Sequence, residues 1–157
     1  MPHLPSRRPA ATLLAVMLAA GLAACAAPSA APSTLYDRLG GAARVTSVVS
    51  RTVERAAHDP RTRRSFEGVK LAALSDSIAQ HICSLADGGC RYEGETMKNS
   101  HRDLKIVASE FDALVTLLRE ELDRAGVDAG AKNDLLRLLA PMKRDIVVAA
   151  TEVASHV

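Results

Sequence analysis

The feature that most constrains the fold is a helical period: apolar side chains recur every three or four residues in successive segments. A period near 3.6 residues places such side chains on one face of an α-helix, whereas a half-buried strand requires strict alternation. The sequence contains no period-two segment of any length. It therefore predicts an all-α fold.

Turn-forming residues divide the first half of this pattern. Thr34 is placed to cap a short helix that stops at Gly40-Gly41. A second helix, with an apolar stripe from Val45 to Ala56, is expected to end before Asp59-Pro60. Residues 61–69 then form an irregular corner, and a third helix follows.

The second half contains a short helix with one histidine, a long helix and a final helix. Ser109, with Asp112 three residues later, resembles a capping box for the long helix. Pro141 predicts a kink or break in the last helix. The expected apolar stripes of the three longer helices are Leu71, Leu74, Ile78, Ile82 and Leu85; Phe111, Leu114, Val115, Leu118 and Leu122; and Leu135, Leu138, Leu139, Met142, Ile146 and Val147.

The amino-terminal residues 1–24 have the layout of a targeting segment. Arg7 and Arg8 precede an apolar run that is shorter than the roughly 20 residues of a membrane span. The run ends in Leu-Ala-Ala-Cys25, which resembles a bacterial lipobox and implies cleavage before Cys25 and its lipidation. An ordinary secretory signal is the alternative.

The remaining chain is expected to hold a tether at residues 25–33, one domain at 34–151 and a disordered tail at 152–157. Without residues 1–24, which contain two of the 20 basic residues and no acidic residue, 18 basic residues balance 18 acidic ones. A neutral domain argues against nucleic-acid binding.

His101 is the residue on which the function depends. Met97, His101 and Leu104 are four and three residues apart, so they share one helix face. An inward histidine there is either a core residue bonded to a carbonyl or a metal ligand whose second ring nitrogen is held by that carbonyl.

A resemblance to a known family favours the metal-ligand interpretation of His101. Several motifs carry this resemblance, in the same order along the chain. Together they resemble a group I truncated haemoglobin over about residues 34–148: Leu35-Tyr-Asp-Arg-Leu-Gly-Gly41, Asp59-Pro60 followed by Phe66, Tyr92-x-Gly94-x-x-Met97-x-x-x-His101, Phe111-Asp112 and Ala140-Pro141-Met142-x-x-Asp145-Ile146-Val147. Ile82-Cys83 and Cys90 are similar to the lipobox-bearing branch of that family.

The resemblance implies a two-over-two helical sandwich around one haem b (iron protoporphyrin IX). His101 is then the proximal iron ligand, and Phe66 packs on the ring. One apolar wall of the haem site is expected from Val53, Leu74, Ile78 and Ile82, and the other from Met97, Leu104, Phe111 and Val115.

The chain departs from the family on the distal side. Many members carry a tyrosine on the second helix and a glutamine or histidine on the third, where this chain has Val53, Leu74 and Ile78. Without a strong hydrogen-bond donor, bound oxygen is expected to escape roughly ten- to a hundredfold faster. A one-residue slip of the alignment would instead place Ser75 at the distal position.

His81, Cys83 and Cys90 leave alternatives open. His81 is either an internal sixth iron ligand or a half-buried histidine bonded to a carbonyl. Cys83 and Cys90 form an even pair for an oxidising compartment, which favours a disulfide. The rival is a zinc site that joins them with His81 and His101, although the spacing fits no common zinc motif.

The expected function is reversible binding or sensing of a diatomic gas (O2, NO or CO) rather than dedicated catalysis. The lipid anchor implies the periplasmic side of the envelope, and Ala26 after the cysteine favours the outer membrane. The alternatives are a redox or electron-transfer haem protein, either peroxidase-like or detoxifying NO, and a haem-free helical lipoprotein that recruits a partner. The sequence does not identify a reductase.

Overall fold

A computed structural model describes residues 33–148; the expected signal segment, Cys25 and the tail 152–157 lie outside them. The described elements are α1 (Leu35–Arg38), α2 (Gly41–His58), the 3-10 helix η1 (Arg63–Phe66), α3 (Leu71–Leu85), α4 (Met97–His101), α5 (Ala108–Arg124), α6 (Ala129–Leu139), the 3-10 helix η2 (Ala140–Met142) and α7 (Lys143–Ile146).

Helices dominate the described region, and the all-α prediction is confirmed. Among residues 33–148, β pairing is limited to one parallel bridge between Ile106 and Val147. No helix within this range is both long and apolar enough to cross a membrane.

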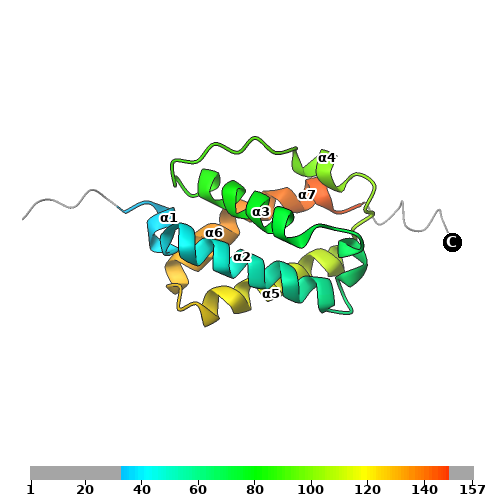
Figure 1. The fold of residues 1–157 in the computed structure, drawn as a ribbon, viewed down its shortest axis with the longest axis horizontal. Helices are drawn as coiled ribbons and strands as arrows, with labels where there is room; N and C mark the ends of the chain where they lie inside the picture. The colour runs from blue at the N-terminus through cyan, green and yellow to red at the C-terminus, as the bar shows by residue number, and fades with distance from the viewer. Residues whose placement is uncertain (1–32, 149–157) are drawn as a thin grey trace, which may run out of the picture. The chain divides into compact units, whose positions relative to one another are not determined.

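The long helices form two antiparallel pairs, α2 with α3 and α5 with α6 (Figure 1). Helix α2 packs against both α3 and α5, so it links the two pairs. This is a two-over-two helical sandwich. Helix α4 packs on α7, next to the bridge between Ile106 and Val147.

Helix α2 has the periodicity that its sequence predicts. Its buried residues recur at helical spacing and form most of one face: Val45, Val48, Val49, Thr52, Val53 and Ala56. Burying one such aliphatic side chain contributes roughly 1.5–3 kcal/mol to folding. Leu39, Ile82, Leu122 and Leu135 from other segments complete the core around this face.

The predicted helix cap at Thr34 and the predicted interruption at Pro141 are confirmed, whereas the predicted cap of the long helix is not. Thr34 and Asp37 form a reciprocal capping box, and Pro141 lies in the first turn of η2, which interrupts the last helix. The prediction that Ser109 caps the long helix is wrong. Helix α5 is capped at Val107, whose N–H donates to a carboxylate oxygen of Glu110 at 2.9 Å.

Helices α3 and α5 each have a buried face beside the stripe that was predicted for them. Small or fully buried residues such as Ala79 and Ala113 form the faces buried in the core. Most side chains of the predicted stripes, such as Leu74 and Ile78 on α3, are only partly buried, whereas Ile82 and Leu122 of the same stripes are buried in the core. Leu74, Ile78 and Leu118 line a cavity between the helices and also pack against the edge of the core.

Candidate functional site

Two cavities of about 240 Å³ and 370 Å³ lie between α3, α4 and α5. We call them the inner and the outer cavity, respectively. Their linings are predominantly apolar. They are parts of one cleft, because both are lined by Phe66, Leu74, Ile78, Ser100, His101, Phe111, Leu114 and Ile146.

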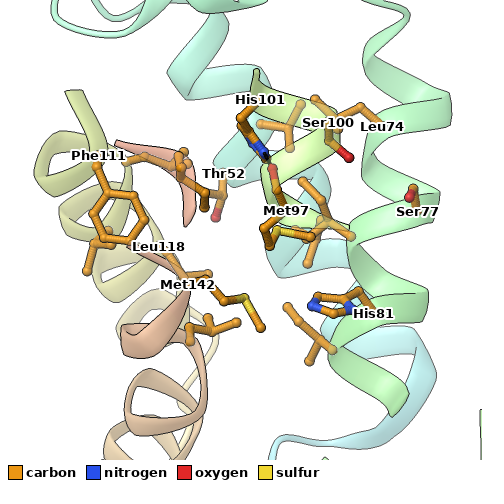
Figure 2. A pocket seen from close by; sticks show the side chains of 18 of the residues that line it. Thr52, Leu74, Ser77, His81, Met97, Ser100, His101, Phe111, Leu118 and Met142 are labelled. Carbon is orange, nitrogen blue, oxygen red and sulfur yellow. Dashed lines mark hydrogen bonds between the residues drawn. The ribbon is translucent and has the colours of Figure 1, made fainter. Parts of the chain in front are cut away.

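His101 lies where the two cavities meet (Figure 2). Its Nδ1 is 2.8 Å from the carbonyl oxygen of Met97. A carbonyl only accepts hydrogen bonds, so Nδ1 carries the proton and Nε2 of the neutral ring has a free lone pair. A metal-binding histidine is typically held in this way, with one nitrogen anchored and the other available.

Contacts beyond α4 fix the position of this short helix. The Thr96 side chain accepts a hydrogen bond from the N–H of Asn99 at 3.2 Å and caps the start of α4. After the helix, Arg64 of η1 donates to the carbonyl oxygens of Leu104 and Lys105 at 3.1 and 3.0 Å. Arg64 also pairs with Glu110, so α4 is tied to η1 and α5.

The structure places the nine predicted haem-contact residues around the cleft. All except Leu104 line the inner cavity: Val53, Phe66, Leu74, Ile78, Ile82, Met97, Phe111 and Val115. Leu104 lines the outer cavity and is 38% exposed. Contact between these residues and haem stays a prediction.

At the positions expected above the iron, the structure shows no side chain with a free hydrogen-bond donor. Val53 is buried and lines the inner cavity. Thr52 lines it too, but its hydroxyl donates to the Val48 carbonyl at 2.8 Å, so it offers the cavity only lone pairs. Ser75 is buried and absent from both linings, whereas Leu74 and Ile78 are in both, which excludes the one-residue slip.

His81 enters the inner cavity from α3 (Figure 2). Its ring packs against Tyr92 with 4.4 Å between ring centroids. Neither ring nitrogen has a hydrogen-bond partner, although both are buried. Burial lowers the pKa of His81 below its usual 6.5, so the ring is neutral at pH 7. The expected alternative of a carbonyl-bonded histidine is therefore wrong.

Cys83 and Cys90 are joined by a disulfide, with Cα atoms 5.6 Å apart. Their sulfurs are therefore not free to bind zinc. Among residues 33–148, no group of three His, Cys, Asp or Glu side chains is arranged to hold a metal. The rival zinc site with His81 and His101 is excluded.

Sequence reasoning did not assign several residues of the inner cavity to the site. Met142 and Ile146 reach it because the chain breaks at Pro141 and turns into α7. Both were in the predicted apolar stripe of the last helix, which was the available signal. The other unassigned lining residues are Val49, Thr52, Ser77, Tyr92, Ser100, Leu114, Leu118 and Leu139.

The sequence profile of the bacterial-like globins matches residues 34–148, which include the whole cleft. The chain belongs to this family. It is a group I truncated globin, as its motifs indicated. It is 29% identical over 114 residues to the group 1 truncated hemoglobin GlbN of a Nostoc species, covering 73% of this chain and 97% of that protein.

Solved structures agree on the fold. This truncated globin resembles the Fe(III) form of truncated hemoglobin from Tetrahymena pyriformis with a TM-score of 0.70 and 20% identity, covering 74% of this chain and 100% of that one. The 2/2 hemoglobin from Synechococcus sp. PCC 7002 gives a TM-score of 0.69 and 23% identity, with coverage of 73% and 98%.

Proposed function

We propose that this truncated globin binds haem b through His101 and reversibly binds a diatomic gas. The observation that carries the proposal is the arrangement at His101. Nδ1 is held by the Met97 carbonyl at 2.8 Å, which leaves Nε2 as the free nitrogen of a residue that lines both cavities. The 2/2 hemoglobin from Synechococcus, which has a covalently attached heme, supports it.

The residues of the cleft fit a haem. Its ring is flat and apolar, and the cleft has apolar walls from α3 and α5 with aromatic side chains at Phe66 and Phe111. A neutral imidazole is the donor that haem iron takes from a proximal histidine. When bound, haem supplies the iron at which the gas ligand attaches.

The distal wall determines which gas is favoured. Bound oxygen carries partial negative charge and is stabilised by a hydrogen-bond donor, whereas CO and NO depend on one much less. Val53 has no donor and Thr52 donates its proton to Val48. Positions 52 and 53 therefore offer bound oxygen no hydrogen bond, which predicts fast oxygen release and little discrimination against CO and NO, and favours gas sensing or exchange over oxygen storage. The unpartnered N–H of His81, in the same cavity, is the donor that would oppose this if it reaches the ligand.

Oxygen dissociation from the haem-loaded protein and from Thr52→Val tests this assignment by stopped flow. We expect the two rates to agree within about twofold, because the Thr52 hydroxyl is bonded to Val48 rather than facing the ligand. A rise of tenfold or more in the variant would mean that Thr52 turns to hold oxygen, and the apolar distal site would be the wrong description.

A second function is favoured by His81, whose buried nitrogens lack partners in the same cavity as His101. As a sixth iron ligand, His81 would exclude gas and suit electron transfer or peroxidase-like turnover. The low-spin ferrous spectrum of such a six-coordinate haem would convert to five-coordinate in His81→Leu. A parent spectrum that is already five-coordinate rejects this role.

We further propose that Cys25 carries a lipid that anchors the protein at the periplasmic side of the bacterial envelope. The lipobox-like Leu-Ala-Ala-Cys25 supports this, and Ala26 favours the outer membrane. Two or more acyl chains suffice for a stable anchor. Radiolabelled palmitate should enter the wild-type chain but not Cys25→Ser. Equal labelling of both would refute the anchor.

A further inference from the structure

The connection between α3 and α4 runs along the edge of the fold beside α3 (Figure 1). We call residues 89–96 the strap. Apart from Tyr92, every residue of the strap is exposed. Within the described chain, residues 89–95 form no backbone–backbone hydrogen bond. Their side-chain hydrogen bonds and ion pairs reach no farther than Asn99.

Two contacts hold the strap to α3. The first is the disulfide from exposed Cys90 to Cys83, which is 1% exposed in the core. The second is the ring of Tyr92, which lies on His81 with 4.4 Å between ring centroids. Both Tyr92 and His81 line the inner cavity, so the second contact closes part of its edge.

Gly94 lets Tyr92 adopt this position. A Cβ at Gly94 would lie 2.2 Å from the Tyr92 hydroxyl oxygen and 2.3 Å from Cζ, so the ring folds back over the glycine. The Tyr92 hydroxyl makes one local hydrogen bond, to the Glu95 carbonyl at 3.4 Å. Because that bond lies within the strap, it does not hold the ring on His81.

We propose that the Cys83–Cys90 disulfide is a redox latch on the inner cavity: its reduction frees the strap and uncovers the cavity at His81. With the disulfide broken, the Tyr92–His81 contact is the remaining attachment of the strap to α3. The segment then gains the conformational freedom that the cross-link removes. No other part of the cleft has to change.

The reaction is thiol–disulfide exchange with a dithiol reductant. A thiolate attacks the exposed Cys90 sulfur, forms a mixed disulfide there and displaces the Cys83 sulfur, which takes up a proton. The second thiol of the reductant then displaces Cys90. Two electrons and two protons pass to the protein, which ends with two thiols, and the dithiol ends as a disulfide.

An uncovered cavity should exchange its bound ligand with solvent at a higher rate. This consequence rests on the proposed haem function: a reduced latch should release haem faster. The chain entropy of the eight-residue loop from Cys83 to Cys90 limits the effect to about 60-fold. We expect an increase of roughly 10- to 60-fold.

Two measurements on the full chain test the latch, each with and without tris(2-carboxyethyl)phosphine. In haem-free protein, the carbethoxylation rate of His81 is followed by peptide mass spectrometry, with exposed His58 as the internal control. In haem-loaded ferric protein, transfer of haem to excess apomyoglobin is followed by absorbance. Cys83→Ala/Cys90→Ala is the matched control for effects of the reductant on the iron.

Reduction should speed both His81 modification and haem transfer in the wild type, and leave the double variant fast under both conditions. Tyr92→Ala should be fast with the disulfide intact. Unchanged His81 modification after complete reduction would overturn the latch, as would faster modification with unchanged haem transfer. A chain that takes up no haem would instead defeat the proposed function, and His81 modification would still decide on the latch.

Discussion

The contact between α2 and α5 contains a buried carboxylate whose removal has a predictable cost. The Glu121 side chain is 2% exposed and accepts hydrogen bonds from Arg51 and Arg55 of α2, both at 2.8 Å. Arg124 of α5 binds the same carboxylate. Glu121→Gln removes the charge and keeps the shape of the side chain. The amide NH2 of the glutamine cannot accept hydrogen bonds from the arginines, as the carboxylate oxygen does.

Breaking a buried ion pair typically costs 3–5 kcal/mol. The arginine side chains are 45%, 32% and 55% exposed, so they can hydrate once the carboxylate is neutral. We therefore expect Glu121→Gln to lower the free energy of unfolding by about 3 kcal/mol, the lower end of this range. For a domain of this size that corresponds to a fall in Tm of roughly 10 °C.

Glu120 provides a matched control. Its side chain is 44% exposed, although it binds Arg55 at 2.6 Å and Arg124 at 3.5 Å. Glu120→Gln should cost no more than about 1 kcal/mol, because exposed ion pairs contribute little. Urea unfolding of both variants and the wild type measures the difference. Equal losses for the two variants would refute the argument from burial.

The pH dependence has a definite sign. Burial raises the pKa of Glu121, but hydrogen bonds from Arg51, Arg55 and Arg124 outweigh burial and bring the pKa below its usual 4.5. The stabilisation is therefore fully present above pH 4.5 and is lost as the pH falls through the folded-state pKa. The gap between wild type and Glu121→Gln should shrink only below pH 4.5. A gap that shrinks at higher pH would contradict this.

Two further predictions concern the distal wall and a helix end. Val53→Tyr introduces a phenol donor into the inner cavity. It should slow oxygen dissociation from the haem-loaded protein by ten- to a hundredfold in flash photolysis, with little effect on CO dissociation. An unchanged oxygen rate would show that position 53 does not face the ligand. Asp128→Ala removes the α6 cap, in which the Asp128 carboxylate accepts hydrogen bonds from the N–H groups of Gly130 and Ala131 at 2.8 and 3.1 Å. The free energy of unfolding, measured in urea, should fall by about 1 kcal/mol. A fall of less than about 0.3 kcal/mol would show that the cap contributes little.

The helices could be predicted because their signals are local. Periodicity located α2, α3 and α5, and turn residues such as Pro141 marked the interruptions. The two faces of α3 and α5 could not be predicted in the same way. A stripe of large apolar residues predicts burial, but it does not show whether a helix or a cavity receives the stripe.

The site depends on contacts between distant segments, which a single sequence does not show. Glu110 caps α5 through the N–H of Val107, and its pairing with Arg64, which lies 46 positions earlier in the chain, is the contact that the sequence does not show. The spacing of Val107 and Glu110 was a local signal for that helix end, but Ser109 is the more usual type of capping residue. Similarly, Tyr92 meets His81 only because the strap returns over α3.

The most direct test of the account is haem binding by the wild type, His101→Ala and His58→Ala. His58 is the matched control because its Nδ1 also lies 2.8 Å from the carbonyl four residues earlier, at an exposed position outside both cavities. Each protein is loaded with haem, and its anaerobic ferrous absorption spectrum is recorded. We predict one haem per chain and a five-coordinate spectrum for the wild type and His58→Ala, and loss or alteration of that spectrum in His101→Ala. Failure of the wild type to hold stoichiometric haem, or an unchanged spectrum in His101→Ala, would contradict the account.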